Sequence, residues 1–258
     1  LSEQYPRIDV ELGEEALRVN NLTNEFVNNV NFSVRKGETL GVAGLMGSGR
    51  TELMRSIFGI YPLNSGTIEV YGKEKKITSP SSAYESGIAY VSEDRKSNGI
   101  IAEMTLRDNV TLASLKDFLG PARNLDKKKE EEASKSYMKS MSIKATSTKQ
   151  QLRYLSGGNQ QKVSIAKNLL TEPKILILDE PTRGVDVGAR KEIYDLINEL
   201  KKEGISIVVV SSDIPEVLGI SDRILVMHEG EISGFMDINE ATQEKIMTLA
   251  VGKEVSAN

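Results

Sequence analysis

The sequence predicts an α/β fold with a parallel β-sheet at its centre. Short apolar blocks without polar interruption recur along the chain, and segments with apolar residues at three-to-four spacing separate them. This alternation of buried strands and amphipathic helices is typical of doubly wound layers. With 258 residues, the chain is long enough for one large domain or two small ones.

Two kinds of strand are predicted. Alternating apolar and polar side chains indicate half-exposed antiparallel strands at residues 17–19, 27–34 and 67–71. Uninterrupted apolar blocks indicate buried parallel strands at residues 40–43, 88–91, 175–178 and 205–210. Helical periodicity marks residues 80–86, 156–170, 188–202 and 241–251. Because ligands bind at the carboxyl ends of parallel strands, the residues that follow the apolar blocks are the candidates for function.

A long insert, residues 92–155, separates the second and third apolar blocks. Helical patterning around residues 106–115 and 126–141 predicts a separate helical subdomain. Its charge run, residues 127–132, has two interpretations, a partner-binding patch or a solvated helix face, and blocks of opposite sign favour the solvated face.

The composition excludes several classes of protein. The net charge of -4 gives no general attraction to nucleic acid or anionic lipid. The absence of cysteine excludes disulfides and thiol nucleophiles, and a single histidine, His228, disfavours metal clusters and a Ser-His-Asp triad. No apolar stretch approaches the ~18 residues that span a bilayer. Residues 1–15 are expected to be a linker, and the start at Leu1 suggests a piece of a longer chain.

A phosphate-binding loop is predicted after the first apolar block. Residues 44–51 have the pattern G-x-x-x-x-G-[K]-[ST], with Arg50 at the lysine position, and a helix to about residue 58 follows. Its glycines permit positive φ and bring N–H groups to phosphate oxygens, and the helix N-terminus adds positive charge. The residues expected to bind phosphate are Gly44, Gly47, Ser48, Gly49, Arg50 and Thr51. The alternative is a glycine-rich turn without a ligand.

The third apolar block ends in two carboxylates, Asp179 and Glu180. This is a Walker B pattern. We expect Asp179, together with Thr51, to hold Mg²⁺, and Glu180 to orient or deprotonate the water that attacks the γ-phosphate. The alternative is a strand that simply ends in an acidic turn.

A second anion site is predicted at residues 155–162, which read Leu-Ser-Gly-Gly-Asn-Gln-Gln-Lys and precede a helix. Ser156 suits the N-cap, and Gly157 and Gly158 expose backbone N–H groups. This motif lies between the phosphate loop and the acidic strand, an order that makes a chance occurrence negligible.

Together these motifs resemble the nucleotide-binding domain of ATP-binding-cassette (ABC) transporters over essentially the whole chain. The resemblance implies a P-loop NTPase fold with a RecA-like core and parallel sheet, an antiparallel β subdomain and a helical subdomain at about 92–155. It implies that residues 16–251 form the domain and 252–258 a C-terminal tail. It also implies ATP and Mg²⁺ as cofactors and a nucleotide-dependent, head-to-tail pair of domains. Each nucleotide then lies between one phosphate loop and the partner's signature, with Asp186 in the D-loop at residues 183–186.

Finer features resemble the second domain of the ATPases of bacterial ribose, galactose and xylose importers. They are the sequences at residues 44–52, 92–96 and 155–162 and the linker-like residues 5–7. The implied partners are the N-terminal ATP-binding domain of the same full-length chain and membrane-spanning permease subunits, with no nucleic acid. The implied location is peripheral, at the cytoplasmic face of the inner membrane.

The chain departs from the family pattern at several positions. Glu93 stands at the Q-loop glutamine and Ser212 at the switch histidine, and both are counted among the catalytic candidates. Phe26 is the candidate for the aromatic residue of the A-loop, and His228 is interpreted as surface or structural. Losing one oriented transition-state donor costs ~10²- to 10³-fold in rate. We therefore expect a weak phosphate site and an intact signature that serves the partner.

Two functions from different classes follow from these motifs. The first is the energy-coupling ATPase domain of a sugar importer, and the second is a regulatory nucleotide-binding and dimerisation module with little turnover. A soluble ABC protein of translation or DNA repair is disfavoured because neither a basic insert nor a coiled coil is visible. The transported sugar leaves no signature in this sequence.

Overall fold

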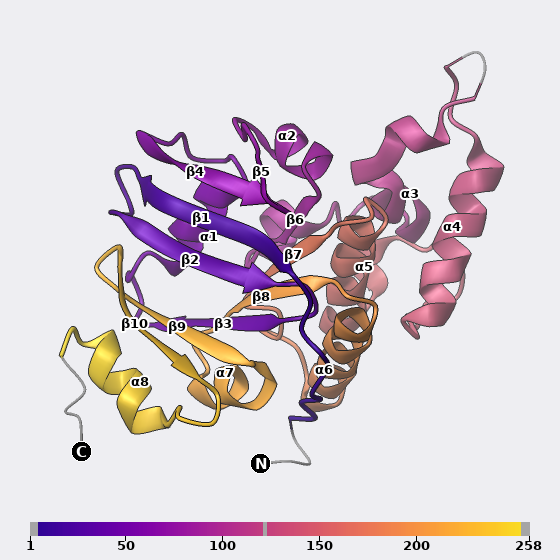
Figure 1. Cartoon of the computed structure of the whole chain (residues 1–258). Helices are drawn as coiled ribbons and strands as arrows, with labels where there is room; N and C mark the ends of the chain where they lie inside the picture. Colours follow the sequence, from indigo (N-terminus) through magenta and orange to yellow (C-terminus); the bar gives the residue numbers. More distant parts are fainter. Residues whose placement is uncertain (1–4, 121–122, 254–258) are drawn as a thin grey trace.

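The computed structural model describes residues 5–120 and 123–253. Figure 1 shows an antiparallel sheet above a larger sheet, with a helical region to one side. Among the described residues, no helix has both the length and the apolar character needed to cross a bilayer.

The smaller sheet is antiparallel and has the strand order β2-β1-β4-β5. Its strands are β1 (Glu15–Thr23), β2 (Val30–Arg35), β4 (Ser65–Val70) and β5 (Lys73–Glu74). Leu17 of β1 pairs with Val34 of β2 and Val70 of β4, so alternate apolar side chains share one buried face. The predicted antiparallel strands are therefore confirmed.

The larger sheet has the order β10-β9-β3-β8-β7-β6. Its strands are β3 (Thr39–Gly44), β6 (Ile88–Val91), β7 (Ile175–Asp179), β8 (Ser206–Val210), β9 (Arg223–His228) and β10 (Glu231–Asp237). All neighbours are parallel except β10, which pairs antiparallel with β9. The four predicted parallel strands are confirmed. Strand β9 was not among the predicted apolar blocks, although its central residues are buried. Strand β10 was not predicted because it is a partly exposed edge strand without an apolar block.

Helices cover both faces of the larger sheet (Figure 1). Their bounds are α1 (Arg50–Ile57), α2 (Pro80–Glu85), α5 (Gly157–Leu169), α6 (Val187–Lys202), α7 (Ile214–Ile220) and α8 (Gln243–Ala250). The predicted helices agree with these bounds to within two residues. Helix α7, a single short segment, was not predicted.

The insert is helical, as predicted. It contains η1 (Arg95–Gly99), α3 (Leu106–Thr111), η2 (Leu112–Phe118), α4 (Lys127–Ser140) and η3 (Leu152–Tyr154). Leu106 and Leu152 belong to the same buried cluster as Leu176 and Leu178 of β7, so the insert packs continuously onto the core. This packing fixes the insert relative to the central sheet.

The charge run at residues 127–132 is only partly a solvated face. Its lysines are exposed, but Glu130 is buried, accepts a hydrogen bond from Thr111 Oγ1 at 2.7 Å and pairs with Lys127 at 3.0 Å. The interpretation as a solvated face is therefore wrong for Glu130, because α4 turns this carboxylate toward α3.

The segment before β1 packs against the core. The Tyr5 ring lies 5.4 Å from the ring of Tyr194, and Lys201 Nζ donates to the Ile8 carbonyl at 2.8 Å. Strand β1 starts at Glu15, the last residue of the predicted linker 1–15. Residues 1–4 of that linker and residues 254–258 of the predicted tail lie outside the described part of the chain.

Candidate functional site

The phosphate loop joins β3 to α1, as its sequence predicts. Gly47 and Gly49 have φ of 78° and 94°, in the left-handed region that favours glycine. Gly49 is the N-cap of α1, so the first-turn N–H groups of α1 lack intrahelical acceptors and point toward the loop. Ser48 Oγ is buried without a hydrogen-bond partner among the described residues. This cradle fits a phosphate group.

Thr51 and Asp179 meet at the start of α1. Thr51 Oγ1 donates to Asp179 Oδ1 at 3.3 Å, and Tyr90 of β6 donates to Asp179 Oδ2 at 2.8 Å. Burial raises the pKa of Asp179 to about 6, although hydrogen bonds from Tyr90 and Thr51 partly offset it, and the charge of Glu93 raises it further. Nothing in the sequence pointed to Tyr90, which only strand pairing of β6 with β7 places here.

Glu180 connects the phosphate loop to the segment after β8. Its φ is 48°, and its N–H donates to the Val210 carbonyl at 2.8 Å. Ser212 Oγ donates to Glu180 Oε2 at 3.2 Å, and Arg50 Nη2 lies 3.8 Å from Oε1. Burial raises the pKa of Glu180, while Ser212 and Arg50 lower it.

Arg50 turns toward the chain's own backbone. Its Nη1 donates to the Ser211 carbonyl at 2.7 Å, in addition to the contact with Glu180. The two contacts hold the guanidinium at the carboxyl ends of β7 and β8. Arg50, Glu180 and Ser212, three of the predicted site residues, are therefore brought together.

Glu93 lies at the end of β6 and contacts the D-loop. Its Oε2 is 3.3 Å from Nη1 of Arg183. This ion pair joins the predicted Q-loop position to the D-loop, and the charge of Glu93 also raises the pKa of Asp179.

The signature motif begins α5. Ser156 is the N-cap, and its Oγ accepts from the N–H of Asn159 at 3.4 Å and from Nδ2 of the same residue at 2.9 Å. A Cβ on Gly158 would lie 2.4 Å from Ala189 Cβ, so only glycine permits this approach of α5 to α6. Asp186 caps α6 by accepting from the Ala189 N–H at 3.0 Å. The structure therefore brings Ser156, Gly157, Gly158 and Asp186 together.

The two glycine loops contact different elements. The space beside Gly49 is bounded by Gly230 and Met227, at the turn between β9 and β10, whereas Gly157 and Gly158 face residues 184–189. The phosphate loop and the signature motif therefore pack against different parts of the chain.

Comparison with known proteins identifies the family. The family model for ABC transporter proteins matches residues 27–183. The chain belongs to the ABC transporter family. It is 53% identical over 252 residues to the ribose import ATP-binding protein RbsA of Clostridium tetani (strain Massachusetts / E88). That alignment covers 97% of this chain and 50% of the relative, so the chain spans about half the length of this curated relative.

Solved ABC cassettes have the same fold. A nucleotide-free ATP-binding cassette from an ABC transporter matches with a TM-score of 0.75 and 26% identity, covering 91% of this chain and 94% of that one. The cbiO1 protein of Clostridium perfringens, part of the ABC transporter complex cbiONQ, matches with a TM-score of 0.74 and 26% identity, covering 91% and 93%. The predicted P-loop NTPase fold with antiparallel β and helical subdomains is confirmed.

Phe26 lies beside the phosphate loop of this ABC cassette. Its backbone oxygen would be 2.4 Å from a Cβ on Gly230, and the N–H of Gly230 donates to the Ser48 carbonyl at 2.9 Å. The Phe26 ring also packs 4.5 Å from the ring of Tyr61, a second aromatic residue that the sequence did not single out. The role of Phe26 as the aromatic residue of the A-loop stays a prediction. His228 Nδ1 lies 3.0 Å from the Ala250 carbonyl at the end of α8, a structural contact as expected.

A buried carboxylate that sequence reasoning missed lies behind the D-loop. Glu216 of α7 is 1% exposed, and its Oε1 accepts hydrogen bonds from Thr182 Oγ1 at 2.6 Å and from the Tyr194 hydroxyl at 2.8 Å. Thr182 lies two residues after Glu180, and its carbonyl accepts from the Val185 N–H at 3.1 Å. Glu216 therefore ties the segment after β7 to α7, which follows Ser212.

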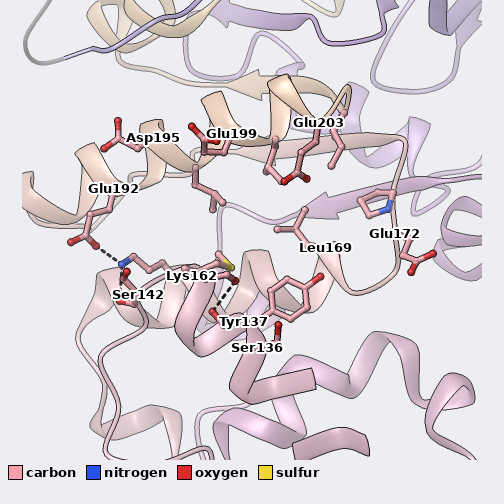
Figure 2. A pocket seen from close by; sticks show the side chains of 16 residues that line it. Ser136, Tyr137, Ser142, Lys162, Leu169, Glu172, Glu192, Asp195, Glu199 and Glu203 are labelled. Carbon is pink, nitrogen blue, oxygen red and sulfur yellow. Dashed lines mark hydrogen bonds and ion pairs between the residues drawn. The ribbon is translucent and has the colours of Figure 1, made fainter. Parts of the chain in front are cut away.

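A cavity of about 910 Å³ lies between α4, α5 and α6 (Figure 2). None of its described lining residues is a predicted site residue. Figure 2 shows Lys162, the last residue of the signature motif, between Glu192 and Ser142. Lys162 forms an ion pair with Glu192 and donates to the Ser142 carbonyl at 3.1 Å. This lysine, at the end of the signature motif, joins the helical subdomain to α6.

The donor set near the phosphate loop suits Mg²⁺. Within the described ranges, no group of three or more His, Cys, Asp or Glu residues is placed to hold a metal by itself. Mg²⁺ is usually bound through one or two protein oxygens together with substrate phosphates, and Thr51 and Asp179 offer such oxygens 3.3 Å apart. The residues present therefore fit Mg²⁺ bound with a nucleotide.

Proposed function

We propose that this chain is the ATP-binding and ATP-hydrolysing, energy-coupling domain of a monosaccharide ABC importer. Its own phosphate site is degenerate, and its signature motif completes the site of a partner domain. The position of Arg50 carries this proposal, because the guanidinium that replaces the phosphate-loop lysine is held by the Ser211 carbonyl and by Glu180. An arginine held in this way is less able than a lysine to adjust to the β- and γ-phosphates.

Each residue at the phosphate site has a role in this proposal. The N–H groups of residues 47–51 bind the phosphates, and Thr51 and Asp179 hold Mg²⁺. When bound, Mg²⁺ neutralises charge on the β- and γ-phosphates. Glu180 orients the attacking water and accepts its proton, for which the raised pKa of its carboxyl is suited. Glu93 and Ser212 lie beside the proposed position of the attacking water. Ser212 stands where the family has the longer side chain of the switch histidine.

The signature site serves a nucleotide on another domain. Ser156 and the first-turn N–H groups of α5 form a second anion-binding end, in contact with the D-loop through Gly157 and Gly158. Because the two sites lie on different elements of one chain, neither is complete without a partner in head-to-tail orientation. The proposed partner is the N-terminal ATP-binding domain of the same full-length chain.

The relative suggests the sugar class, and membership of the ABC transporter family suggests the location. The relative's name states ribose import, and we extend this to a pentose or similar monosaccharide for the present chain. The other proposed partners are the membrane-spanning permease subunits, and the proposed location is the cytoplasmic face of the membrane.

The test compares the two sites in the full-length protein. Ser156→Ala should lower the steady-state ATPase rate about 100-fold, and Arg50→Ala less than tenfold. Thr105→Ala is the matched control, because Thr105 caps α3 in the same way without contacting the signature motif. Equal losses from the Ser156 and Arg50 variants would contradict the assignment.

A second candidate is a regulatory nucleotide-binding module with little turnover. The contacts of Ser212 and Arg50 with Glu180 favour this module, because they engage both carboxylate oxygens of the proposed catalytic base. Steady-state hydrolysis by the isolated chain at high protein concentration separates the two functions. If the chain hydrolyses ATP and Glu180→Gln abolishes this activity, the ATPase function is supported. If the chain binds nucleotide without hydrolysing it, the regulatory module is supported.

A further inference from the structure

Arg95 lies against the signature motif. It begins η1, two residues after Glu93, and its Nη2 would lie 3.2 Å from a Cβ on Gly157, the first residue of α5. The carbonyl oxygen of Gly184 in the D-loop would lie 2.9 Å from the same Cβ. The guanidinium therefore occupies the junction of the Q-loop segment, the signature motif and the D-loop, a position that a side chain on Gly157 would block.

The charge of Arg95 has no counter-ion in the described part of the chain. Its Nε is buried without a hydrogen-bond partner, and the nearby carboxylates are engaged elsewhere. Glu93 pairs with Arg183, and Asp94 accepts from the Ser97 N–H at 3.0 Å. Burial lowers the pKa of Arg95 below its ordinary value.

This arrangement is electrostatically unfavourable without an anion. The N-terminus of α5 carries partial positive charge, and Arg95 adds a full charge beside it. Arg107, a second arginine of the helical insert, differs from Arg95. It contacts both Asp108, at 3.0 Å, and Glu131, at 3.9 Å. Arg95 as a whole is partly exposed, but its Nε is buried without a partner among the described residues. A partly buried cation without a counter-ion, next to a helix N-terminus, indicates a site that a ligand anion completes.

We propose that Arg95 is a phosphate-binding residue of the signature site, which contacts the terminal phosphate of a nucleotide held by the phosphate loop of a second ATP-binding cassette. The inference rests on the proposed head-to-tail pairing and adds a side-chain cation to a site otherwise made of N–H groups and Ser156. Two observations carry it, the approach of the guanidinium to Gly157 and its lack of a partner. A planar guanidinium binds two phosphate oxygens at once, which a backbone N–H does not.

The first test is the stability of the nucleotide-free chain in urea at low salt. Arg95→Met should leave the unfolding midpoint at or above that of the unaltered chain, because it removes an unpaired charge. Arg107→Met is the matched control and should lower the midpoint by removing two carboxylate contacts. A midpoint of Arg95→Met below that of the unaltered chain would show a structural role and overturn the proposal.

The second test is pairing in Mg-ATP, measured by sedimentation. Arg95→Met should weaken self-association at least tenfold, Arg95→Lys should restore it to within tenfold, and Arg107→Met should leave it intact. Thr51→Val removes the magnesium-binding hydroxyl and should also prevent self-association. A mixture of Arg95→Met and Thr51→Val should associate, since one intact composite site forms between them.

The outcomes separate this inference from the proposed function. If Arg95→Met associates as well as the unaltered chain, or if the mixture does not associate, Arg95 does not act on a partner's nucleotide. If the unaltered chain shows no Mg-ATP-dependent association, the comparison moves to the full-length protein, in which the N-terminal domain is the proposed partner. An ATPase rate of Arg95→Met equal to that of the unaltered full-length protein then overturns the inference, whereas a loss of at least tenfold supports it. The urea midpoints then still report whether Arg95 is a structural residue.

Discussion

The phosphate loop and the signature motif are both glycine-containing loops that start a helix, but their polar side chains are engaged differently. At the phosphate loop, Arg50, Glu180 and Ser212 satisfy one another through contacts of 3.2 to 3.8 Å. At the signature motif, Arg95 Nε has no hydrogen-bond partner among the residues that the structure describes. The first region has internal contacts that a nucleotide must replace, and the second is completed by an anion from outside.

The glycines of the two regions also serve different purposes. Gly47 needs a positive φ and has open space around it, whereas Gly158 needs space and has no positive φ. A phosphate loop must bend its backbone around a ligand, and a signature helix must approach α6 closely. Gly47 is therefore required for its backbone conformation, and Gly158 is required because a side chain there has no space.

The largest effect is expected at Gly158. Gly158→Ala places a Cβ 2.4 Å from Ala189 Cβ and should lower the free energy of unfolding by about 2 to 3 kcal/mol, measured in urea. Gly47→Ala meets no neighbour within 4 Å and should lose only about 1 kcal/mol, from its φ of 78°. Gly188→Ala in α6 is the control and should be neutral or stabilising. Equal losses at Gly158 and Gly47 would remove the distinction between the two loops.

The next effect concerns the buried charge of Asp179. In the magnesium-free chain the folded state keeps this proton up to about pH 6, while the unfolded state releases it near pH 4. Stability therefore falls as pH rises from about 4 to 6 and stays low above that range. Asp179→Asn removes this dependence and should raise the free energy of unfolding by about 2 kcal/mol at pH 8, with no gain at pH 4. A gain that is independent of pH would exclude the buried charge as its cause.

A tenfold effect is expected at Arg50. Arg50→Lys frees the position from the Ser211 carbonyl and should tighten Mg-ATP binding at least tenfold, about 1.4 kcal/mol, by titration calorimetry. Arg55→Lys, on the same helix but bonded to Tyr61, should leave the affinity unchanged. Unchanged affinity in Arg50→Lys would mean that the internal contacts of Arg50 do not weaken the phosphate site.

The smallest effect is expected at Thr182, which links both regions. Thr182→Val removes the hydrogen bond to Glu216 and should lower the turnover of the full-length protein about fivefold, about 1 kcal/mol. Thr182→Ser keeps the hydroxyl and should retain the rate of the unaltered protein. A purely steric role would give the opposite result, because valine keeps the shape of threonine and serine loses its methyl group. Thr171→Val, whose hydroxyl bonds only the Asn168 carbonyl, is the control.

The sequence by itself determined the motifs, their order and the class of strands β1 to β4 and β6 to β8. Uninterrupted apolar blocks gave β3, β6, β7 and β8, and glycine spacing gave the two loops, because these patterns depend on burial and local backbone geometry. Edge strand β10, which is partly exposed, and the short α7 lacked such patterns.

Only the tertiary structure decided which side chains meet. Tyr90 reaches Asp179, Glu216 reaches Thr182 and Arg95 lies on Gly157, although 34 to 89 residues separate the first two pairs. Such contacts depend on strand order and helix packing, which no local window of sequence contains. The same holds for Arg50, because its charge was visible in the sequence while its engagement with the ends of β7 and β8 required the folded sheet.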